Sequence, residues 1–308
     1  MCILPMDIYN KLCIDYKKHC QKIGIFCLQI NLYYGIINIC EAIIMTKFTA
    51  VTDMHYSDRL NNGDRLNSLS AKKLKEALES ENKDNGFIVN LGDTADGYPE
   101  YKPQLELLGE IADIFKASGR KFYSVIGNHD TSSDKHDYYK ILGMPNRYYT
   151  FDAGDYLGVV LDAAMDDPEK PYPDHEMTWY TPYLDEEQIQ WFQKTVNESE
   201  KRILVFTHFP FIIPDPDCEL INNPFRNHYI LNRDKIMDVL CCNDKIRAVF
   251  SGHYHDGSVM LIDGKPFVIF RSMAEGGECT FADVEIDDET LKITGHGRQE
   301  SFTLTAEK

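Results

Sequence analysis

The sequence predicts an α/β fold, and two patterns along the chain support this class. Between residues 48 and 250, short apolar runs rich in Val, Ile and Phe alternate with segments of helical periodicity, which is typical of strand-helix-strand units. After residue 255, closely spaced strand-like runs are separated by short turns such as Asp263-Gly264, which indicates antiparallel hairpins. We therefore expect strand-helix alternation followed by an antiparallel part.

The expected strands are short and apolar, as buried strands are. The alternating part has them at 48–52, 87–91, 122–126, 203–206 and 248–250, and the hairpin part at 259–262, 266–270, 281–286 and 291–295. Four segments have apolar residues at helical spacing, at 71–78, 104–116, 185–196 and 232–240. Gly119 is expected to stop the second helix and Asn232 to cap the fourth.

Each of the five strands before residue 255 is followed by side chains that can bind metal ions. The motifs are Asp53-Met54-His55, Gly92-Asp93-Thr94-Ala95-Asp96, Gly127-Asn128-His129-Asp130, Thr207-His208 and Gly252-His253-Tyr254-His255. Each motif alone has an ordinary explanation, because Gly-Asp and Gly-Asn form turns and a strand-end His often satisfies a local hydrogen bond. Together they supply Asp, Asn and His without a thiolate, a ligand set that suits Mn, Fe or Zn. Ligands of α/β sheets gather at the carboxyl ends of the strands, so we expect one shared site there.

In this order, the five motifs resemble the signature of the calcineurin-like metallophosphoesterases. This superfamily includes purple acid phosphatases, class III cyclic-nucleotide phosphodiesterases and Ser/Thr protein phosphatases. The match spans residues 53–255, and no signature position is missing. The resemblance implies a four-layer α/β/β/α sandwich of two mixed β-sheets flanked by helices, with the metal site at the carboxyl ends of the strands.

The resemblance also implies a site with two metal ions. One ion would be held by Asp53, His55, Asp93 and His255, and the other by Asp93, Asn128, His208 and His253. Asp93 would then bridge the pair, since a carboxylate has two oxygens and a charge that offsets two dications. Two metals about 3.5 to 4 Å apart can stabilise both the attacking and the leaving oxygen at phosphorus, and they make hydroxide available near neutral pH.

Two further residues match positions that act on the substrate in this family. The residue matching His129 faces the substrate, stabilises phosphoryl oxygens and protonates the leaving group, and the residue matching Asp96 is its partner. A carboxylate orients an imidazole and stabilises its protonated form. We therefore expect His129 and Asp96 to be catalytic and Asn128 and His129 to contact the substrate, with a plain turn carboxylate as the alternative for Asp96. Asp130 is expected to serve the loop backbone.

The motifs favour one branch of the superfamily. Gly-Asn-His-Asp together with Thr207-His208-Phe209-Pro210 is most similar to the cyclic-nucleotide phosphodiesterase and nucleotide-pyrophosphatase members. The expected function is hydrolysis of a phosphodiester, nucleotide or related phosphate ester by metal-activated hydroxide. One alternative is a phosphomonoesterase of the purple acid type, although residues 94–97 offer no Tyr ligand. Another is a catalytically silent scaffold of the same fold, although such proteins usually lose ligands.

Composition is that of an ordinary soluble protein, with 43% hydrophobic and 26% charged residues among 308. The net charge of −17 argues against a broad nucleic-acid surface, so the expected partner is a small phosphate ester. A nuclease that binds through the metals and a local patch is a minor alternative. Neither an obligatory membrane nor a protein partner is indicated. The nine cysteines have no zinc-site spacing and no clear disulfide framework. This cysteine usage favours a reducing, cytoplasmic location.

Residues 1–44 form an extension ahead of a catalytic domain expected at 45–308. Three lysines precede an apolar stretch at 23–40, but Gln29, Asn31 and Asn38 interrupt it and no small-residue cleavage site follows. Our leading hypothesis is that Met45 is the native start. The alternative is a weak signal-anchor that exports the protein or holds it at a membrane.

Two segments are richer in loop residues than a minimal fold needs. They span 166–183, with several Pro and aromatic residues, and 214–229, which ends in Arg226, His228 and Tyr229. Long loops often bind ligands, so aromatic faces here could stack a nucleobase and Arg226 could contact a phosphate. The alternative is that both segments are surface loops without a binding role.

Overall fold

The computed structural model describes residues 25–32, 35–42, 45–59, 61, 63–79, 86–98, 100–165, 182–214 and 228–305. The chain divides into two units, Met1–Met45 and Thr46–Lys308. In the first unit, strands β1 (Ile25–Leu32) and β2 (Gly35–Ala42) pair antiparallel. All the predicted site residues belong to the second unit. None of the helices in the described ranges has the length and apolar character needed to cross a bilayer.

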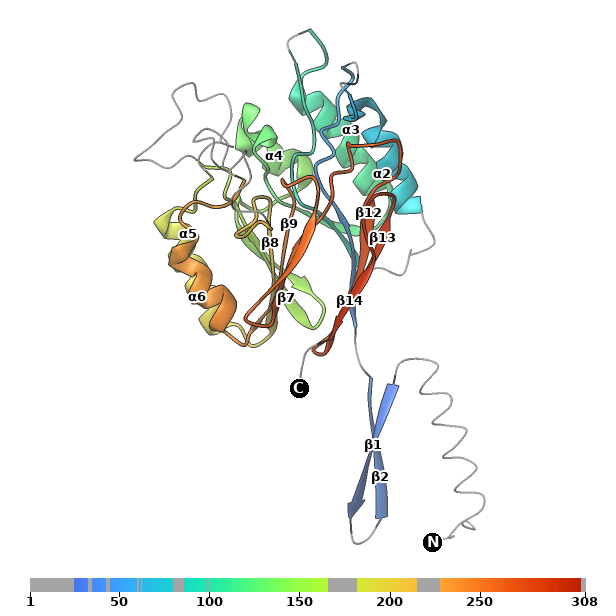
Figure 1. Ribbon diagram of the computed structural model, residues 1–308, viewed down its shortest axis with the longest axis vertical. Helices are drawn as coiled ribbons and strands as arrows, with labels where there is room; N and C mark the ends of the chain where they lie inside the picture. The colour runs from blue at the N-terminus through green and yellow to red at the C-terminus, as the bar shows by residue number, and fades with distance from the viewer. Residues whose placement is uncertain are drawn as a thin grey trace. The chain divides into compact units, whose positions relative to one another are not determined.

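Two six-stranded mixed sheets form the second unit (Figure 1). The first sheet has the order β10-β11-β9-β8-β7-β6, in which the four inner strands are parallel and each edge strand is antiparallel to its neighbour. Its strands are β6 (Tyr149–Ala153), β7 (Tyr156–Leu161), β8 (Arg202–Thr207), β9 (Ile246–Ser251), β10 (Ser258–Ile262) and β11 (Lys265–Ile269).

The second sheet has the order β14-β13-β12-β3-β4-β5. Strands β3, β4 and β5 are parallel, whereas β12, β13 and β14 continue the sheet in antiparallel fashion. Its strands are β3 (Thr46–Val51), β4 (Phe87–Asn90), β5 (Lys121–Ser124), β12 (Phe281–Ile286), β13 (Thr290–His296) and β14 (Phe302–Thr305). Both sheets are mixed, as the sequence predicted.

The two sheets face each other across a buried aromatic core. Phe48 of β3 lies edge-on to Phe206 of β8 and to Phe250 of β9, with ring centroids 5.6 and 5.4 Å apart. Such edge-to-face pairs add to the apolar burial that holds the layers together. This packing places the carboxyl ends of β3, β4, β8 and β9 in one region.

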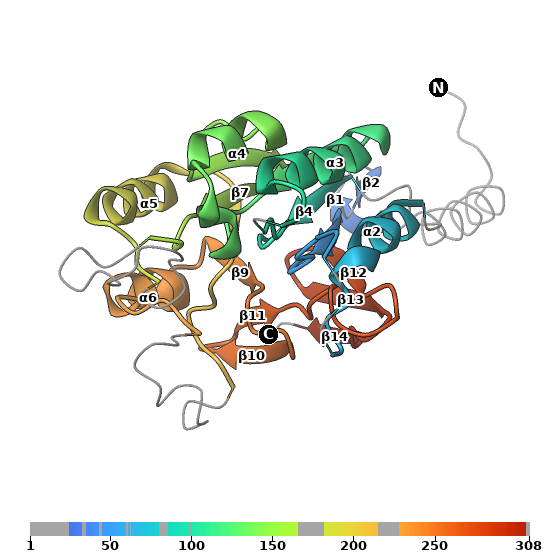
Figure 2. The same cartoon turned by 90° about the horizontal axis from the view of Figure 1, so that it is seen from above.

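Helices flank both sheets (Figures 1 and 2). They are α2 (Ser70–Glu79), α3 (Gln104–Ala117), α4 (Lys135–Leu142), α5 (Glu186–Glu198) and α6 (Asp234–Cys242). Leu74 of α2 and Phe115 of α3 belong to a buried cluster with Val51 and Ile88 of the second sheet. From above, α5 and α6 lie on one side of the strands and α2 lies on the other (Figure 2). The α/β sandwich predicted from the sequence is confirmed.

The structure corrects one helix start and adds one helix and three strands to the second unit. Asn232 does not cap the fourth predicted helix, because α6 begins at Asp234 after Arg233. The Asn232 side chain instead accepts a hydrogen bond from the Leu184 N–H at 3.0 Å and donates one to the Leu184 carbonyl at 2.7 Å. Helix α4, the hairpin of β6 and β7, and strand β14 lie outside the predicted set.

Candidate metal centre

The strand-end motifs converge from both sheets. Residues following β3, β4, β8 and β9 and the loop after β5 supply buried Asp, His and Asn side chains to one region. Their ligand atoms form three groups in which all atoms lie within 4.8 Å of one another: Asp53, His55 and His255; His55, Asp93 and His129; and Asp93, His208 and His253. The predicted site residues are therefore brought together in space.

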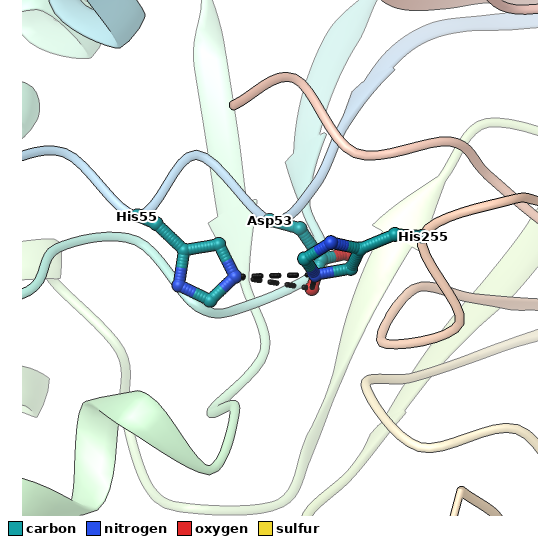
Figure 3. Close-up of side chains that lie close together, drawn as sticks. All are labelled: Asp53, His55 and His255. Atoms are coloured by element: carbon teal, nitrogen blue, oxygen red, sulfur yellow. Dashed lines mark hydrogen bonds and ion pairs between the residues drawn. The ribbon is translucent and has the colours of Figure 1, made fainter. Parts of the chain in front are cut away.

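The first group surrounds a point beside Asp53 (Figure 3). His255 Nε2 lies 3.3 Å from Asp53 Oδ1 and 3.3 Å from His55 Nε2. His55 Nε2 also lies 3.6 Å from Asp93 Oδ2. Two imidazole nitrogens and two carboxylate oxygens thus face a common centre, which is how a metal ion arranges its donors.

The second group lies on the other side of Asp93. His208 Nε2 lies 3.3 Å from Asp93 Oδ2 and 3.2 Å from Asn128 Oδ1. His253 is buried, and its Nε2 has no hydrogen-bond partner among the described residues. An unpartnered polar atom in a buried site is costly unless another species binds it. Because Asp93 Oδ2 is close to both groups, the donor set fits two metal ions that share this carboxylate.

Hydrogen bonds outside this centre orient the imidazole rings. His208 Nδ1 donates to the Leu91 carbonyl at 2.8 Å, and His255 Nδ1 donates to Glu275 Oε1 at 2.7 Å. Arg298 Nη1 donates to the other Glu275 oxygen at 3.0 Å. Each bond places a proton on Nδ1, so that the neutral ring presents the lone pair of Nε2 to the centre, the usual arrangement of a metal-binding histidine. Glu275 and Arg298 are absent from the predicted set, since no sequence motif marks them.

The backbone at the centre is strained. Among the described residues, five that are not glycine have positive φ, and four of them are Asp53 at 50°, His55 at 44°, Asp93 at 50° and His253 at 64°. The left-handed region costs such residues about 1–2 kcal/mol each. Strain of this kind persists where the surrounding structure enforces it and tends to occur at functional sites. Its concentration at these four positions supports a functional role independently of the sequence motifs.

Glycines allow the loops to approach one another closely. A Cβ at Gly127 would lie 2.2 Å from Asp93 Oδ1, and one at Gly252 would lie 2.0 Å from Thr52 Oγ1. Asp130 ties the same loops together by accepting N–H bonds from Asp93 and Thr94 at 2.9 Å each and from Gly127 at 2.8 Å. The prediction that Asp130 serves the loop backbone is confirmed.

His129 and Asp96 form a hydrogen-bonded pair beside the centre. His129 Nδ1 lies 2.9 Å from Asp96 Oδ1, and the backbone N–H of His129 donates to Asp93 Oδ1 at 2.8 Å. Asp96 also contacts His55, whose Nδ1 lies 3.3 Å from the same oxygen. Burial disfavours protonation of His129, but the Asp96 and Asp93 carboxylates outweigh it and raise its pKa to about 9. In the absence of metal ions, the two carboxylates therefore favour the protonated form of His129.

Two more side chains reach this region. Arg65 Nη2 lies 3.3 Å from His255 Nδ1, and the His228 ring centroid lies 5.2 Å from that of His253. His228 therefore places the end of the predicted 214–229 loop beside the centre. Residues 166–181 and 215–227, including Arg226 and most of the aromatic residues noted in the sequence, lie outside the described residues. Arg65 had no sequence signal of its own.

A family model for the calcineurin-like phosphoesterases matches residues 46–257. The chain belongs to the calcineurin-like phosphoesterase family. A manganese-dependent ADP-ribose/CDP-alcohol diphosphatase from Oryza sativa subsp. japonica is 22% identical over 313 residues, which cover 85% of this chain and 94% of the rice protein. This phosphoesterase is therefore a metal-dependent phosphoric ester hydrolase with a dinuclear centre, as the sequence predicted.

Solved structures show the same fold. A dimetal phosphatase from Danio rerio has a TM-score of 0.67 and 20% identity, covering 85% of this chain and 99% of that one. The protein described as GAP50, the anchor in the inner membrane complex of Plasmodium, has a TM-score of 0.54 and 14% identity, covering 86% of this chain and 90% of that one. Small phosphate esters are substrates that fit this family.

Proposed function

We propose that this phosphoesterase hydrolyses the diphosphate bond of a nucleotide linked to a small polar group, with manganese as its metal. The observation that carries the proposal is the similarity to the rice diphosphatase, because it extends over nearly the whole length of that protein. Carboxylate and amide oxygens are donors that suit Mn²⁺, and the Asp and Asn side chains at the centre supply them.

We further propose how the side chains divide between the two ions. Asp53, His55 and His255 would hold one, and Asn128, His208 and His253 the other, with Asp93 shared between them. The distances of Asp93 Oδ2 to His55 Nε2, 3.6 Å, and to His208 Nε2, 3.3 Å, support the shared position. When bound, two such ions activate water and offset the charge that develops on phosphoryl oxygens.

His129 is proposed as the general acid and Asp96 as the residue that positions it. His129 is partly exposed, unlike His208, which is fully buried. Its Nδ1 is held by Asp96, so Nε2 is left to contact the substrate, whose departing oxygen needs a proton. Asn128, whose amide oxygen faces His208, would contact the same phosphate group.

The proposed substrate is small, and the proposed location is a reducing compartment such as the cytoplasm. An overall charge of −17 opposes binding of nucleic acid over a broad surface. The thiols of Cys241, Cys242 and Cys279 are free, which is consistent with reducing conditions. Fractionation of cells that express the tagged chain tests this, and recovery in the membrane or secreted fraction would contradict it.

A substrate panel tests the proposed activity. The Mn²⁺-loaded protein is assayed with ADP-ribose, CDP-glycerol, cyclic AMP, bis-p-nitrophenyl phosphate and p-nitrophenyl phosphate, and products are separated by chromatography. We expect the highest kcat/KM for a diphosphate, with AMP or CMP as one product. A clear preference for p-nitrophenyl phosphate would favour the phosphomonoesterase alternative. Loss of turnover in His129→Ala excludes a contaminating enzyme.

A further inference from the structure

A second pocket lies at the end of the first sheet opposite the metal centre. It has a volume of about 420 Å³ and is lined by Arg202, Arg247, Lys265, Asp244, Asp288 and Gly264, among others. Arg202 begins β8, whose last residue precedes His208, and Arg247 is the second residue of β9. At about 3.3 Å per strand residue, the length of β8 separates this pocket from the metal centre by roughly 20 Å. The pocket is thus distinct from the phosphoesterase site.

Arg247 is a buried cation that forms no ion pair with the carboxylates of the described residues, although Asp287 and Asp288 lie near enough to favour its charged form. Its side chain is 6% exposed. Nε donates to the Asp287 carbonyl at 3.0 Å, and no carboxylate of the described residues lies within 4.0 Å of the guanidinium. Burial lowers the pKa of Arg247, but a guanidinium remains protonated in proteins. A buried charge that lacks an ionic partner is costly. An anion bound beside the guanidinium would therefore stabilise the folded protein.

Lys265 adds a second cation, which is only partly buried. Its ammonium group donates to the carbonyls of Asn243 and Ile246, at 3.2 Å for Ile246, and makes no ion pair with any described carboxylate. Arg202, by contrast, is paired with the exposed Asp288 at 2.7 Å. The residues that line the pocket therefore comprise three cations and two carboxylates, Asp244 and Asp288, which leaves one positive charge in excess in a chain whose net charge is −17.

The shape of the pocket leaves room for a ligand between these cations. Gly264 forms the turn between β10 and β11, and a Cβ built on it would meet nothing within 4 Å. The volume lies in the range of pockets that bind small molecules, about 300–1,000 Å³. A planar guanidinium pairs with the oxygens of a phosphate in a bidentate manner, and a lysine ammonium supplies a further point charge.

We propose that this pocket is a second ligand site, which binds a phosphate group between Arg247 and Lys265. The group is either free inorganic phosphate or the phosphate of a nucleoside monophosphate, since both present the same oxygens. A phosphate bound there would contact residues of β8, of β9 and of the turn before β11. Because it would bind the folded chain and not the unfolded one, it would stabilise the fold by mass action. The inference does not depend on the proposed diphosphatase activity.

Phosphate stoichiometry tests the proposal directly. Equilibrium dialysis of the Mn²⁺-loaded protein against labelled inorganic phosphate is compared for the wild type, Arg247→Met, Arg202→Gln and Lys292→Met. Lys292 is half-exposed and pairs with Glu285 away from this pocket, so Lys292→Met is the matched control. We expect Arg247→Met to bind one phosphate fewer per chain than the wild type and the control, with unchanged turnover. Competition by AMP then distinguishes a nucleotide ligand from free phosphate.

The Arg202→Gln variant keeps the test decisive if Arg247→Met fails to fold. Arg202 is partly exposed, so its replacement leaves the core intact. Phosphate binding at this pocket should weaken about ten-fold, because a nearby cation is lost and the Asp288 carboxylate is left without its partner. Equal phosphate stoichiometry and affinity in the wild type and in every folded pocket variant would overturn the proposal.

Discussion

Glu275 Oε1 accepts a hydrogen bond from Nδ1 of His255 at 2.7 Å, while Arg298 donates to the other Glu275 oxygen at 3.0 Å. The pair holds the His255 ring with Nε2 directed at Asp53. A carboxylate in this position also makes the imidazole a stronger metal ligand. Glu275 therefore orients a proposed metal ligand, although it lies outside the set of side chains that the motifs identify.

Glu275→Gln should weaken metal binding while leaving the fold intact. The amide can still accept a hydrogen bond, but its lack of charge reduces the basicity of His255, and we expect metal affinity to fall about 10- to 100-fold. Titration with Mn²⁺ measures the change. Glu300→Gln is the control, because Glu300 is largely exposed and its one ion pair among the described residues is with Arg271. Equal metal affinity in both variants would contradict the role assigned to Glu275.

Gly127→Ala should damage the centre, whereas Gly109→Ala should not. A Cβ at Gly127 would lie 2.2 Å from Asp93 Oδ1 and 2.4 Å from the Asp93 nitrogen, so the Asp93 loop must move. Gly109 lies within α3 with open space around its Cβ position, where alanine should add about 0.5–1 kcal/mol of stability. Metal content and thermal unfolding of both variants check this. Normal metal content in Gly127→Ala would show that the loops tolerate displacement.

His129→Ala should separate proton transfer from metal binding. We expect it to retain its metal ions and to lose about 10²- to 10⁴-fold in rate, the usual contribution of a positioned acid or base. The loss should be smaller for aryl esters, because their leaving groups need little protonation. Rates with p-nitrophenyl and alkyl phosphodiesters provide the comparison. Equal losses on the two classes would argue against His129 as the general acid.

Asp96→Asn should shift the alkaline side of the pH profile. The Asp96 carboxylate raises the pKa of His129, so the protonated imidazole persists to higher pH than in an ordinary histidine. An amide removes that contribution, which lowers the pKa and removes the proton donor at lower pH. The alkaline limb of kcat/KM should therefore move to lower pH relative to the wild type. An unmoved limb in Asp96→Asn would mean that His129 does not set it.

The residues of the metal centre could be predicted from the sequence, whereas the residues that hydrogen-bond to them could not. Residues such as Asp53 and His208 directly follow apolar strands, and the carboxyl ends of parallel strands lie in one region. The positions of these residues along the chain were therefore enough to predict that they meet in one site. Glu275 contacts His255 from a loop 20 residues further along the chain, and no motif in the sequence around it marks it as a partner of that histidine. Arg65 reaches the centre from a segment without regular pattern.

Secondary structure was missed where elements are short or where a side chain has a tertiary partner. Helix α4 has only eight residues, although Asp134 caps it and Gly143 ends it with φ of 68°. The hairpin of β6 and β7 has clear alternation at Tyr149, Phe151 and Ala153, all buried. Asn232 is of a residue type that is favoured at helix N-caps, yet its side chain makes hydrogen bonds with the Leu184 backbone.

A chain beginning at Met45 should fold and match the full-length chain in turnover. Both six-stranded sheets and every proposed ligand lie beyond that residue. Circular dichroism, metal content and activity on the best substrate of the panel measure the outcome. Failure to fold would show that residues 1–44 are needed by the domain. Membrane recovery of the longer form alone would instead support an anchor.

Metal content of Asp93→Asn tests the dinuclear centre most directly. Asp93 Oδ2 lies near both His55 and His208, so removing its charge should weaken both metal positions, whereas His55→Ala should chiefly deplete one. Asp113→Asn, on the exposed face of α3, is the control. Elemental analysis should find two metal ions per chain in the wild type and the control, and substantially fewer in Asp93→Asn. Two tightly bound ions per chain in Asp93→Asn would contradict the bridging role of Asp93.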